Sequence, residues 1–273
     1  MQNSFFTFSF LAAGLTDIGA KRENNEDRIY LDPEKGFFAV SDGMGGLRHG
    51  DKASDYVKEA LPGLIGTYTE NLPPEMSPEE AAEALKVLIG IMSDTLFRAG
   101  NERTDGKHRF EYGATLLGVW LFGERAIYLC LGDSRGYLLK KDGERLEQVT
   151  QDMNVAALMV RNGLMTPKEA AESSVSNRLT AFVGMEAPAT PESFVRTVSA
   201  GDVILLCSDG LYGMVPETEI VSLLRSGKEA EAVCRELIDT ANRYGGRDNI
   251  SAIVIAIGER KGNTEEENKP SEG

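Results

Sequence analysis

Cysteine and histidine, the residues that most often bind zinc, are scarce in this chain. Its 273 residues include only three cysteines, Cys130, Cys207 and Cys234, and two histidines, His49 and His108. The cysteines lie far apart, and two of them stand in apolar runs. We therefore expect reduced core residues rather than a disulfide framework or a zinc site. A histidine-rich metal site is excluded, and a histidine-based triad would depend on one of two side chains.

Long apolar runs and an excess of basic residues are also missing. No segment reaches the roughly 18 unbroken apolar residues of a membrane-spanning helix. Residues 1–17 contain aromatic side chains without a basic region before them, which favours a strand over a signal peptide. The net charge of −14 repels nucleic acid and anionic membranes. We therefore expect a cytoplasmic protein without a nucleic-acid or membrane partner.

The chain otherwise has the composition of a globular protein, with 41% hydrophobic and 26% charged residues. Its periodicity predicts strands, two long helices, many strands, a helical insert, strands, two helices and a last strand. Because neighbouring strands are joined like hairpins, we expect antiparallel sheets with helices packed outside. The predicted strands are 5–14, 28–41, 113–122, 125–133, 136–143, 146–150, 193–199, 202–208 and 250–258, and the predicted helices are 51–66, 78–97, 153–178, 216–226 and 229–244.

Local signals mark several boundaries of these elements. Segments 77–80 and 166–169 each place a hydroxyl residue before a proline, with a glutamate at the third helical position, which is typical of a helix start. Pro62 strains the middle of the first helix. Residues 259–273 are polar, charged and without aromatic side chains, so we expect a disordered tail.

Four aspartates share one sequence context, because each borders an apolar strand and has a small residue beside it. Asp-Gly is common in turns, so one such motif would indicate only a turn. Four of them indicate a site, since hard divalent cations prefer carboxylate, carbonyl and water oxygens. The four are Asp42, Asp133, Asp209 and Asp248.

The first of these motifs is followed by three glycines within four residues. A glycine beside Asp42 lets the backbone come close enough to lend a carbonyl oxygen. We therefore expect Asp42 and the carbonyl of Gly43 to hold metal, while Gly45 and Gly46 keep the approach open.

A second group of charged residues, 22–27, follows a glycine turn and precedes a predicted strand. Arg22 has the planar fork that binds a phosphate with two hydrogen bonds. Glu26 and Asp27 can support a metal-bound water. Taken alone, a run of mixed charge of this kind is more typical of a solvated loop.

Six motifs together resemble one family. In chain order they are TDIGAKRENNED, VSDGMGG, GATL, GDSRGYL, LLCSDGL and GGRDNIS. Each is weak alone, but their order and spacing resemble those of the bacterial metal-dependent serine/threonine phosphatases of the protein phosphatase type 2C (PPM) family. The resemblance covers about residues 8–258.

This resemblance implies an α+β fold, a four-layer α-β-β-α sandwich with two stacked antiparallel sheets flanked by helices. It implies a catalytic domain over residues 1–258 and leaves 259–273 as the acidic tail. Residues 153–178 match the flap beside the site, which varies within the family and is linked to substrate choice.

The same resemblance implies hydrolysis of phosphoserine and phosphothreonine in proteins, opposing a serine/threonine kinase. The reaction uses a water that bridges two Mn²⁺ or Mg²⁺ ions, with a third, looser ion in bacterial members. We expect a monomer. By likeness, Asp42 bridges both ions, and Asp209 and Asp248 complete one site. The Gly43 carbonyl, with Glu26 nearby or through water, completes the other. Asp133 helps to hold the third ion, and Arg22 binds phosphate.

The chemistry agrees with the resemblance. A phosphomonoester is a dianion that resists nucleophiles in water, and two cations about 4 Å apart can lower the pKa of a shared water and neutralise the phosphoryl oxygens. No covalent intermediate is needed, which suits a chain whose cysteines are predicted to be buried.

The chain departs from the family pattern at two places. Met44 stands where some members, chiefly eukaryotic ones, carry histidine, and methionine cannot protonate a leaving alkoxide. The acid is then expected to be a metal-bound water. Asp152 and Met153 stand where the family often has Asp-His, so we expect no histidine role there, and we expect His49 and His108 at the surface.

Two other functions fit parts of the sequence. A pseudophosphatase that serves as a binding or regulatory module is possible, although retention of the aspartates and Arg22 argues against it. A phosphatase for a small phosphorylated metabolite would share the same motifs. A deep basic pocket would favour the metabolite, and a shallow open groove would favour peptides.

Overall fold

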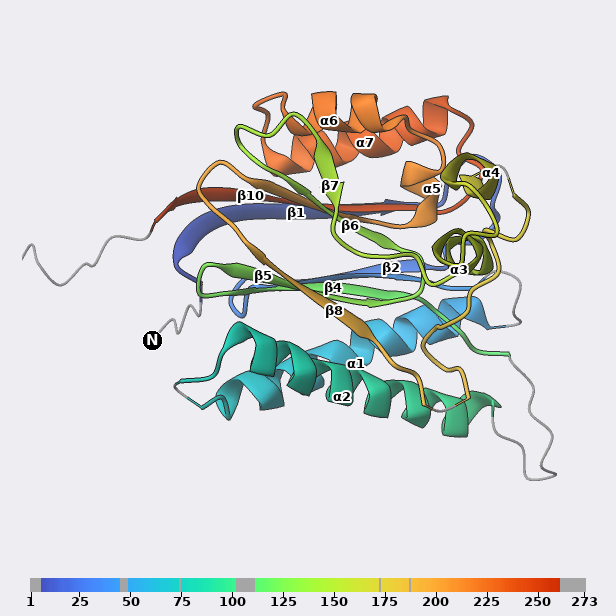
Figure 1. Cartoon of the computed structure of the whole chain (residues 1–273), viewed down its shortest axis with the longest axis horizontal. Coiled ribbons are helices and arrows are strands. Elements are labelled where there is room, and N and C mark those ends of the chain that lie inside the picture. The colour runs from blue at the N-terminus through green and yellow to red at the C-terminus, as the bar shows by residue number, and fades with distance from the viewer. Residues whose placement is uncertain are drawn as a thin grey trace, which may run out of the picture.

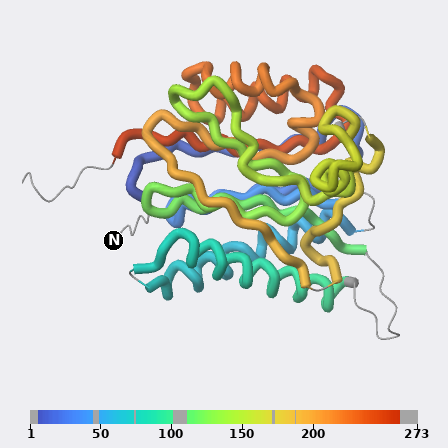
Figure 2. Tube along the Cα trace, viewed as in Figure 1, coloured from blue at the N-terminus to red at the C-terminus, as the bar shows by residue number. Residues whose placement is uncertain are grey.

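The computed structural model describes residues 6–44, 49–73, 75–101, 111–171, 173–186 and 188–260. Two antiparallel sheets of five strands each stack face to face (Figure 1). The first sheet has the order β1-β10-β9-β6-β7 and the second has the order β2-β3-β4-β5-β8. Helices cover the outer faces, which confirms the predicted α+β sandwich of four layers (Figure 2).

The strands follow the predicted pattern closely. In the first sheet they are β1 (Phe8–Asp17), β10 (Ile250–Arg260), β9 (Val203–Cys207), β6 (Arg135–Leu139) and β7 (Leu146–Gln148). In the second they are β2 (Asp27–Asp32), β3 (Phe37–Asp42), β4 (Leu116–Phe122), β5 (Arg125–Leu131) and β8 (Glu192–Thr197).

Several strand predictions were wrong in detail. The segment 28–41 is not one strand but two, because the chain turns between β2 and β3, where Gly36 has a φ of 67°. A left-handed conformation of this kind suits glycine and ends a strand. The first strand begins and ends three residues later than the predicted 5–14, and β10 continues to Arg260. Residues 261–273, most of the predicted tail, lie outside the described residues.

Two pairs of helices cover the sheets. Helices α1 and α2 pack against the second sheet, while α6 and α7 lie over the first. Pro62 lies inside α1 without ending it, and the predicted capping box at Ser77 and Glu80 opens α2. The helices are α1 (Gly50–Glu70), α2 (Pro78–Leu96), η1 (Phe97–Asn101), α3 (Val155–Arg161), α4 (Pro167–Ala171), α5 (Asp209–Tyr212), α6 (Glu217–Leu224) and α7 (Ala230–Arg243).

Apolar side chains fill the three spaces between the four layers. The central layer between the sheets includes Phe38, Leu117 and Ile253, each fully buried. Full burial of one such side chain contributes about 1.5–3 kcal/mol. The three cysteines are buried free thiols, as predicted. No helix within the described ranges is long and apolar enough to cross a membrane.

The antiparallel topology brings the predicted site residues to one end of the sandwich. Strands β3 and β9 end there, and β6 and β10 begin there, since Cys207 pairs with both Arg135 and Ala252. The short helices α3, α4 and α5 lie at this same end, on the right in Figure 1. The loops that carry the four aspartates are therefore neighbours in space.

Candidate metal centre

Asp42, the half-buried last residue of β3, lies close to two other carboxyl groups. The strand register places the fully buried Asp27 directly opposite it, and the charge of Asp209 also acts on it. Burial, followed by the charges of Asp27 and Asp209, raises the pKa of Asp42 well above its usual range.

The carboxyl groups around Asp42 come from both sheets. Asp27 begins β2 in the second sheet, and Asp209 follows β9 of the first. Burial, with the charges of Asp133 and Asp248, raises the pKa of Asp209 to about 8. Burial also raises the pKa of Asp27 to about 6, although hydrogen bonds from two serines oppose the rise. The site thus concentrates negative charge where little water remains to screen it.

Two of these groups each leave one buried oxygen without a hydrogen-bond donor. They are Oδ1 of Asp27 and Oδ1 of Asp209. The other oxygen of Asp27, Oδ2, accepts hydrogen bonds from Ser208 Oγ and Ser251 Oγ, both at 2.7 Å. A buried polar atom without a partner costs about 1–3 kcal/mol. A shared proton or a bound cation would remove this cost.

Arg22 and Asp248 form an ion pair at the rim of this group. Arg22 Nη2 donates to Asp248 Oδ2 at 2.7 Å. The residue predicted to bind phosphate and one of the predicted metal ligands are therefore in contact. Their side chains are 40% and 35% exposed, and an exposed ion pair of this kind opens at little cost.

Asn249 fixes the loop that carries Arg22. Its Oδ1 accepts a hydrogen bond from the backbone of Glu26 at 2.8 Å, and its Nδ2 donates to the carbonyls of Ile18 and Asn24, each at 2.9 Å. Asn249 is only 4% exposed. The amide anchors residues 18–26 to the chain segment that bears Asp248.

Gly43 lies where two other chain segments approach. Its N–H donates to the carbonyl of Glu26 at 3.1 Å. A Cβ at this position would lie 2.5 Å from the carbonyl oxygen of Gly50 and 2.7 Å from that of Glu26. Only glycine fits here. Gly45 and Gly46, predicted to keep the approach open, lie outside the described residues.

Glu26 is half-buried beside the start of α1. Burial raises its pKa, and the charge of Asp51 adds to this effect, whereas Arg22 opposes it. Glu26 is therefore a further carboxyl group at the same edge, on the side of Gly43.

Asp133 occupies the turn between β5 and β6 and is 8% exposed. Burial, with the charge of Asp152, raises its pKa to about 6, while a hydrogen bond with Asn154 opposes the rise. Its charge also acts on Asp42 and Asp209. Asp133 thus belongs electrostatically to the same centre.

The carboxyl groups are neighbours, but they do not converge on one point. Within the described part of the chain, no three His, Cys, Asp or Glu side chains are grouped as a ready metal site. The donor set nevertheless fits Mn²⁺ or Mg²⁺, because it consists of carboxylate and carbonyl oxygens. Its unpaired buried oxygens fit as well. A cation would have to draw Asp42, Asp209 and Asp248 together and take the place of Arg22 on Asp248.

A cavity of about 900 Å³ opens beside these residues. It lies between the carboxylate edge and the helices α3 and α4. Its walls carry both signs of charge. The charged residues that line it are Asp133, Arg135, Asp152, Arg161, Asp209, Arg247 and Asp248.

The predicted flap, residues 153–178, is partly helical and enters and leaves the sandwich at one place. The backbone N–H of Val155 donates to the carbonyl of Arg178, and that of Thr180 donates to the carbonyl of Met153, each at 2.8 Å. We call residues 153–155 and 178–180 the flap neck. The prediction that this segment influences substrate choice stays a prediction.

Several residues that shape the site were not singled out from the sequence. Ser208 and Ser251 bind Asp27, Asn249 binds the Arg22 loop, and Tyr212 donates its hydroxyl to the carbonyl of Asp133 at 3.0 Å. Ser208, Asn249 and Ser251 each stand within three residues of a predicted ligand, which was the available signal. Their partners are distant in sequence and left no such signal.

His49 packs beside an aromatic ring instead of joining this group. Its ring lies against that of Tyr112, with centroids 4.7 Å apart, and the residue is half-buried. His108 lies outside the described residues.

The fold and this acidic edge define a class, the metal-dependent phosphatases built on a double-sheet sandwich. Residues 19–254 match the family model described as Protein phosphatase 2C. The chain belongs to the protein phosphatase 2C family, which is a family of hydrolases.

Named relatives agree with this assignment. The serine/threonine phosphatase stp of Listeria innocua is 31% identical over 243 residues, which cover 88% of this chain and 93% of that protein. The serine/threonine protein phosphatase PstP of Mycobacterium tuberculosis is 36% identical over 251 residues, covering 90% of this chain and 44% of PstP. A crystal structure of the PstP catalytic domain with two manganese ions has a TM-score of 0.75 and 31% identity, covering 93% of this chain and 100% of that one.

Proposed function

We propose that this chain hydrolyses phosphoserine and phosphothreonine in proteins and so opposes a serine/threonine kinase. The observation that carries the proposal is the group of carboxyl groups around Asp42, two of which have a buried oxygen without a hydrogen-bond partner. Arg22, a phosphate-binding side chain by likeness, stands at the rim of this group.

Two Mn²⁺ or Mg²⁺ ions are the proposed partners of this group. Asp42 would contact both, Asp209 and Asp248 would complete one site, and the Gly43 carbonyl with Glu26 would complete the other. Asp133 would help to hold a third ion. Bound ions would lower the pKa of a water shared between them and neutralise charge on the phosphoryl oxygens. The two manganese ions in the PstP structure support this assignment.

The chain's own residues would then orient the substrate. Arg22 would exchange its exposed ion pair with Asp248 for two hydrogen bonds to the phosphate. Asp27 is fully buried and is held by two serines. We therefore place it behind Asp42, where it orients that carboxylate, rather than against the attacking water.

The cavity supports a phosphoprotein over a small phosphorylated metabolite. Its walls include three arginines and four aspartates, whereas a uniformly basic pocket would suit a small polyanion. The presence of every predicted ligand at one edge supports an enzyme over a pseudophosphatase.

The test is hydrolysis of a phosphothreonine peptide and of a small aryl phosphate, with Mn²⁺ and then with excess chelator. We expect chelator-sensitive turnover of the peptide. Folded protein without turnover in any divalent cation would make the binding module the better hypothesis, and turnover of small phosphates alone would point to a metabolite.

A pair of arginine variants sharpens this test. Arg22→Ala should raise the KM for the peptide about 10-fold or more, since a charged hydrogen bond contributes roughly 1.5–3 kcal/mol. Arg196→Ala is the matched control, because Arg196 pairs with Glu147 away from the site. Equal kinetics for the two variants would contradict the role of Arg22.

A further inference from the structure

Arg135 lies between the flap neck and the metal centre. It begins β6, two residues after Asp133, and its guanidinium forms a bidentate ion pair with Asp152. Nε donates to Oδ1 at 2.9 Å, and Nη2 donates to Oδ2 at 2.7 Å. A two-pronged pair fixes the plane of the guanidinium as well as its position.

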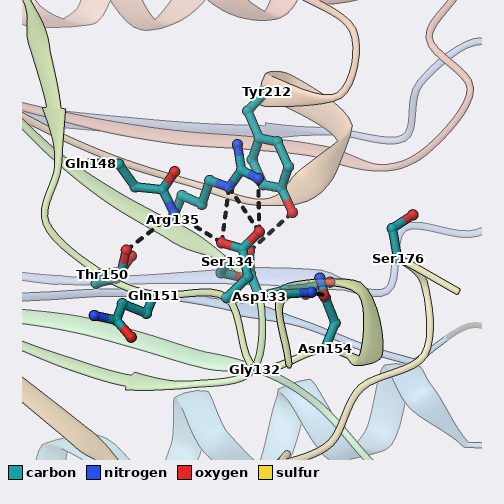
Figure 3. A network of polar contacts seen from close by, with 12 residues as sticks. Gly132, Asp133, Ser134, Arg135, Gln148, Thr150, Gln151, Asn154, Ser176 and Tyr212 are labelled. Atoms are coloured by element: carbon teal, nitrogen blue, oxygen red, sulfur yellow. Dashed lines mark hydrogen bonds and ion pairs between the residues drawn. The ribbon is translucent and has the colours of Figure 1, made fainter. Parts of the chain in front are cut away.

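The face of the same guanidinium is stacked on Tyr212. The Cζ atom of Arg135 lies 3.7 Å from the centre of the tyrosine ring, a cation–π contact. Tyr212 ends α5, the helix that begins with Asp209, and its hydroxyl donates to the carbonyl of Asp133 at 3.0 Å. In Figure 3 the ring of Tyr212 lies beside the guanidinium of Arg135, and its hydroxyl points down towards Asp133.

Asp152 in turn is tied to the base of the flap. It precedes Met153, a residue of the flap neck, whose N–H donates to the carbonyl of Gly132 at 2.9 Å. Gln148 Nε2 donates to Asp152 Oδ1 at 2.9 Å from the other side. The carboxylate of Asp152 is therefore held by two partners, and its backbone continues directly into the flap neck.

We propose that Arg135 and Tyr212 are positioning residues that couple the flap neck to the carboxylate of Asp133. A shift of the flap neck moves Asp152, which tilts the guanidinium and the ring stacked on it. The tyrosine hydroxyl then carries the shift to the backbone of Asp133. We call Arg135, Asp152 and Tyr212 the Arg135 clamp.

Stability alone does not require this arrangement. A buried ion pair can often be replaced by apolar side chains of similar volume with little loss, whereas removal of one partner leaves a costly unpaired charge. The ion pair therefore gives defined orientation rather than extra stability. The orientation of Arg135 affects Asp133 through Tyr212, and the charge of Asp133 acts on Asp42 and Asp209. The inference rests on the proposed phosphatase activity.

The first test is Tyr212→Phe, which keeps the ring over the guanidinium and removes the hydrogen bond to Asp133. We expect kcat for the phosphopeptide to fall about 10-fold, as is typical for loss of a residue that orients a metal ligand. KM should change less than about 2-fold, because the substrate is not contacted. Tyr137→Phe is the matched control, since the hydroxyl of Tyr137 contacts Arg135 at 3.4 Å instead of the Asp133 backbone. It should retain wild-type kcat.

A second arm asks whether the effect passes through Asp133. In an Asp133→Asn background, Tyr212→Phe should lower kcat less than about 2-fold further, because residues that act as one unit are not additive. Equal losses in both backgrounds would show a general structural effect and would overturn the proposal.

A third arm does not depend on activity. Titration calorimetry with Mn²⁺ should show weaker binding of the loosest ion in Tyr212→Phe and in Arg135→Lys, which keeps the charge but loses the fork. Tyr137→Phe should bind as the wild type does. If the wild type lacks turnover, the proposed function fails, and this titration still decides the clamp. Unchanged Mn²⁺ binding and kcat in Tyr212→Phe would overturn the clamp alone.

Discussion

The tripeptide Ser-Asp-Gly follows a buried strand once in each sheet, and the two copies continue differently. After Asp42 the chain stays extended, and Gly43 forms a bridge with Ala114. After Ser208 the chain turns at once into α5, with Asp209 in its first turn. The same tripeptide thus lies at the end of a strand in one sheet and at the start of a helix in the other.

The two serines also have different tasks. Ser41 Oγ donates to the backbone carbonyl of Thr115 at 2.7 Å, within the second sheet. Ser208 Oγ donates to the carboxylate of Asp27, which belongs to the opposite sheet. The first serine secures a neighbouring strand, while the second joins the two sheets below the carboxylates. The Ser-Asp-Gly motif therefore predicts where the aspartate lies. The structure around the motif determines which group the serine binds.

The largest expected effect comes from the two aspartates themselves. Asp42→Asn and Asp209→Asn should each lower kcat at least about 100-fold, because loss of a residue that merely orients a metal ligand already costs roughly 10–100-fold. Asp42→Asn should be the more severe, since Asp42 is the ligand proposed to contact both ions and the charges of Asp27 and Asp209 both act on it. Circular dichroism should show an intact fold. Activity that persists in either variant would refute the site assignment.

Substitution of the glycine in each Ser-Asp-Gly motif, Gly43 or Gly210, should lower the free energy of unfolding by different amounts. A Cβ on Gly210 would meet the carbonyl oxygen of Asn249 even more closely than one on Gly43 meets that of Gly50. Gly210→Ala should therefore lower the free energy of unfolding more than Gly43→Ala, with costs of about 1–3 kcal/mol or above. Urea denaturation measures both. Equal midpoints for the two variants would contradict this order.

The two serines should differ by a smaller amount. Ser208→Ala removes a hydrogen bond to a carboxylate and also the acceptor of the Ser251 N–H, at a cost of roughly 2–3 kcal/mol. Ser41→Ala removes one neutral hydrogen bond, for about 1 kcal/mol. The Tm and the urea midpoint should be lower for Ser208→Ala than for Ser41→Ala. The reverse order would refute the role of the Ser208–Asp27 hydrogen bond in joining the two sheets.

The smallest effect is a pH dependence of the metal-free protein. The folded pKa of Asp209 is about 8, against a usual value of 3.8. Between these two values the folded state keeps a proton that the unfolded state has released. The free energy of unfolding therefore falls as pH rises from about 4 to about 8. The Tm in chelator should drop by a few degrees between pH 6 and pH 8. Asp209→Asn should flatten this dependence, whereas an equally steep fall in the variant would assign it to other groups.

Local signals were the most predictable part of the structure. The capping box of Ser77 and Glu80 formed as predicted, because its hydrogen bonds join residues three apart. The layered fold followed from hydrophobic periodicity. The meeting of the carboxyl groups could be expected as well, since antiparallel strands bring their connecting loops to shared edges.

Long-range pairing was not predictable from this single sequence. Arg22 and Asp248 are 226 residues apart, yet they form an ion pair. Tyr212 and Asp133 are 79 residues apart. Their contacts depend on how the two sheets stack and on where α5 turns, and a run of four helical residues is too short to give a periodic signal.

The flap neck gives the fold a further property. Backbone hydrogen bonds join Met153 to Thr180 and Val155 to Arg178. The segment between them therefore leaves and rejoins the sandwich at one place. An insert with closely spaced ends can change length or sequence at small entropic cost to the body that carries it. We therefore expect that a segment of different length or sequence, grafted between these two pairs, would leave the sandwich and its carboxyl groups in place.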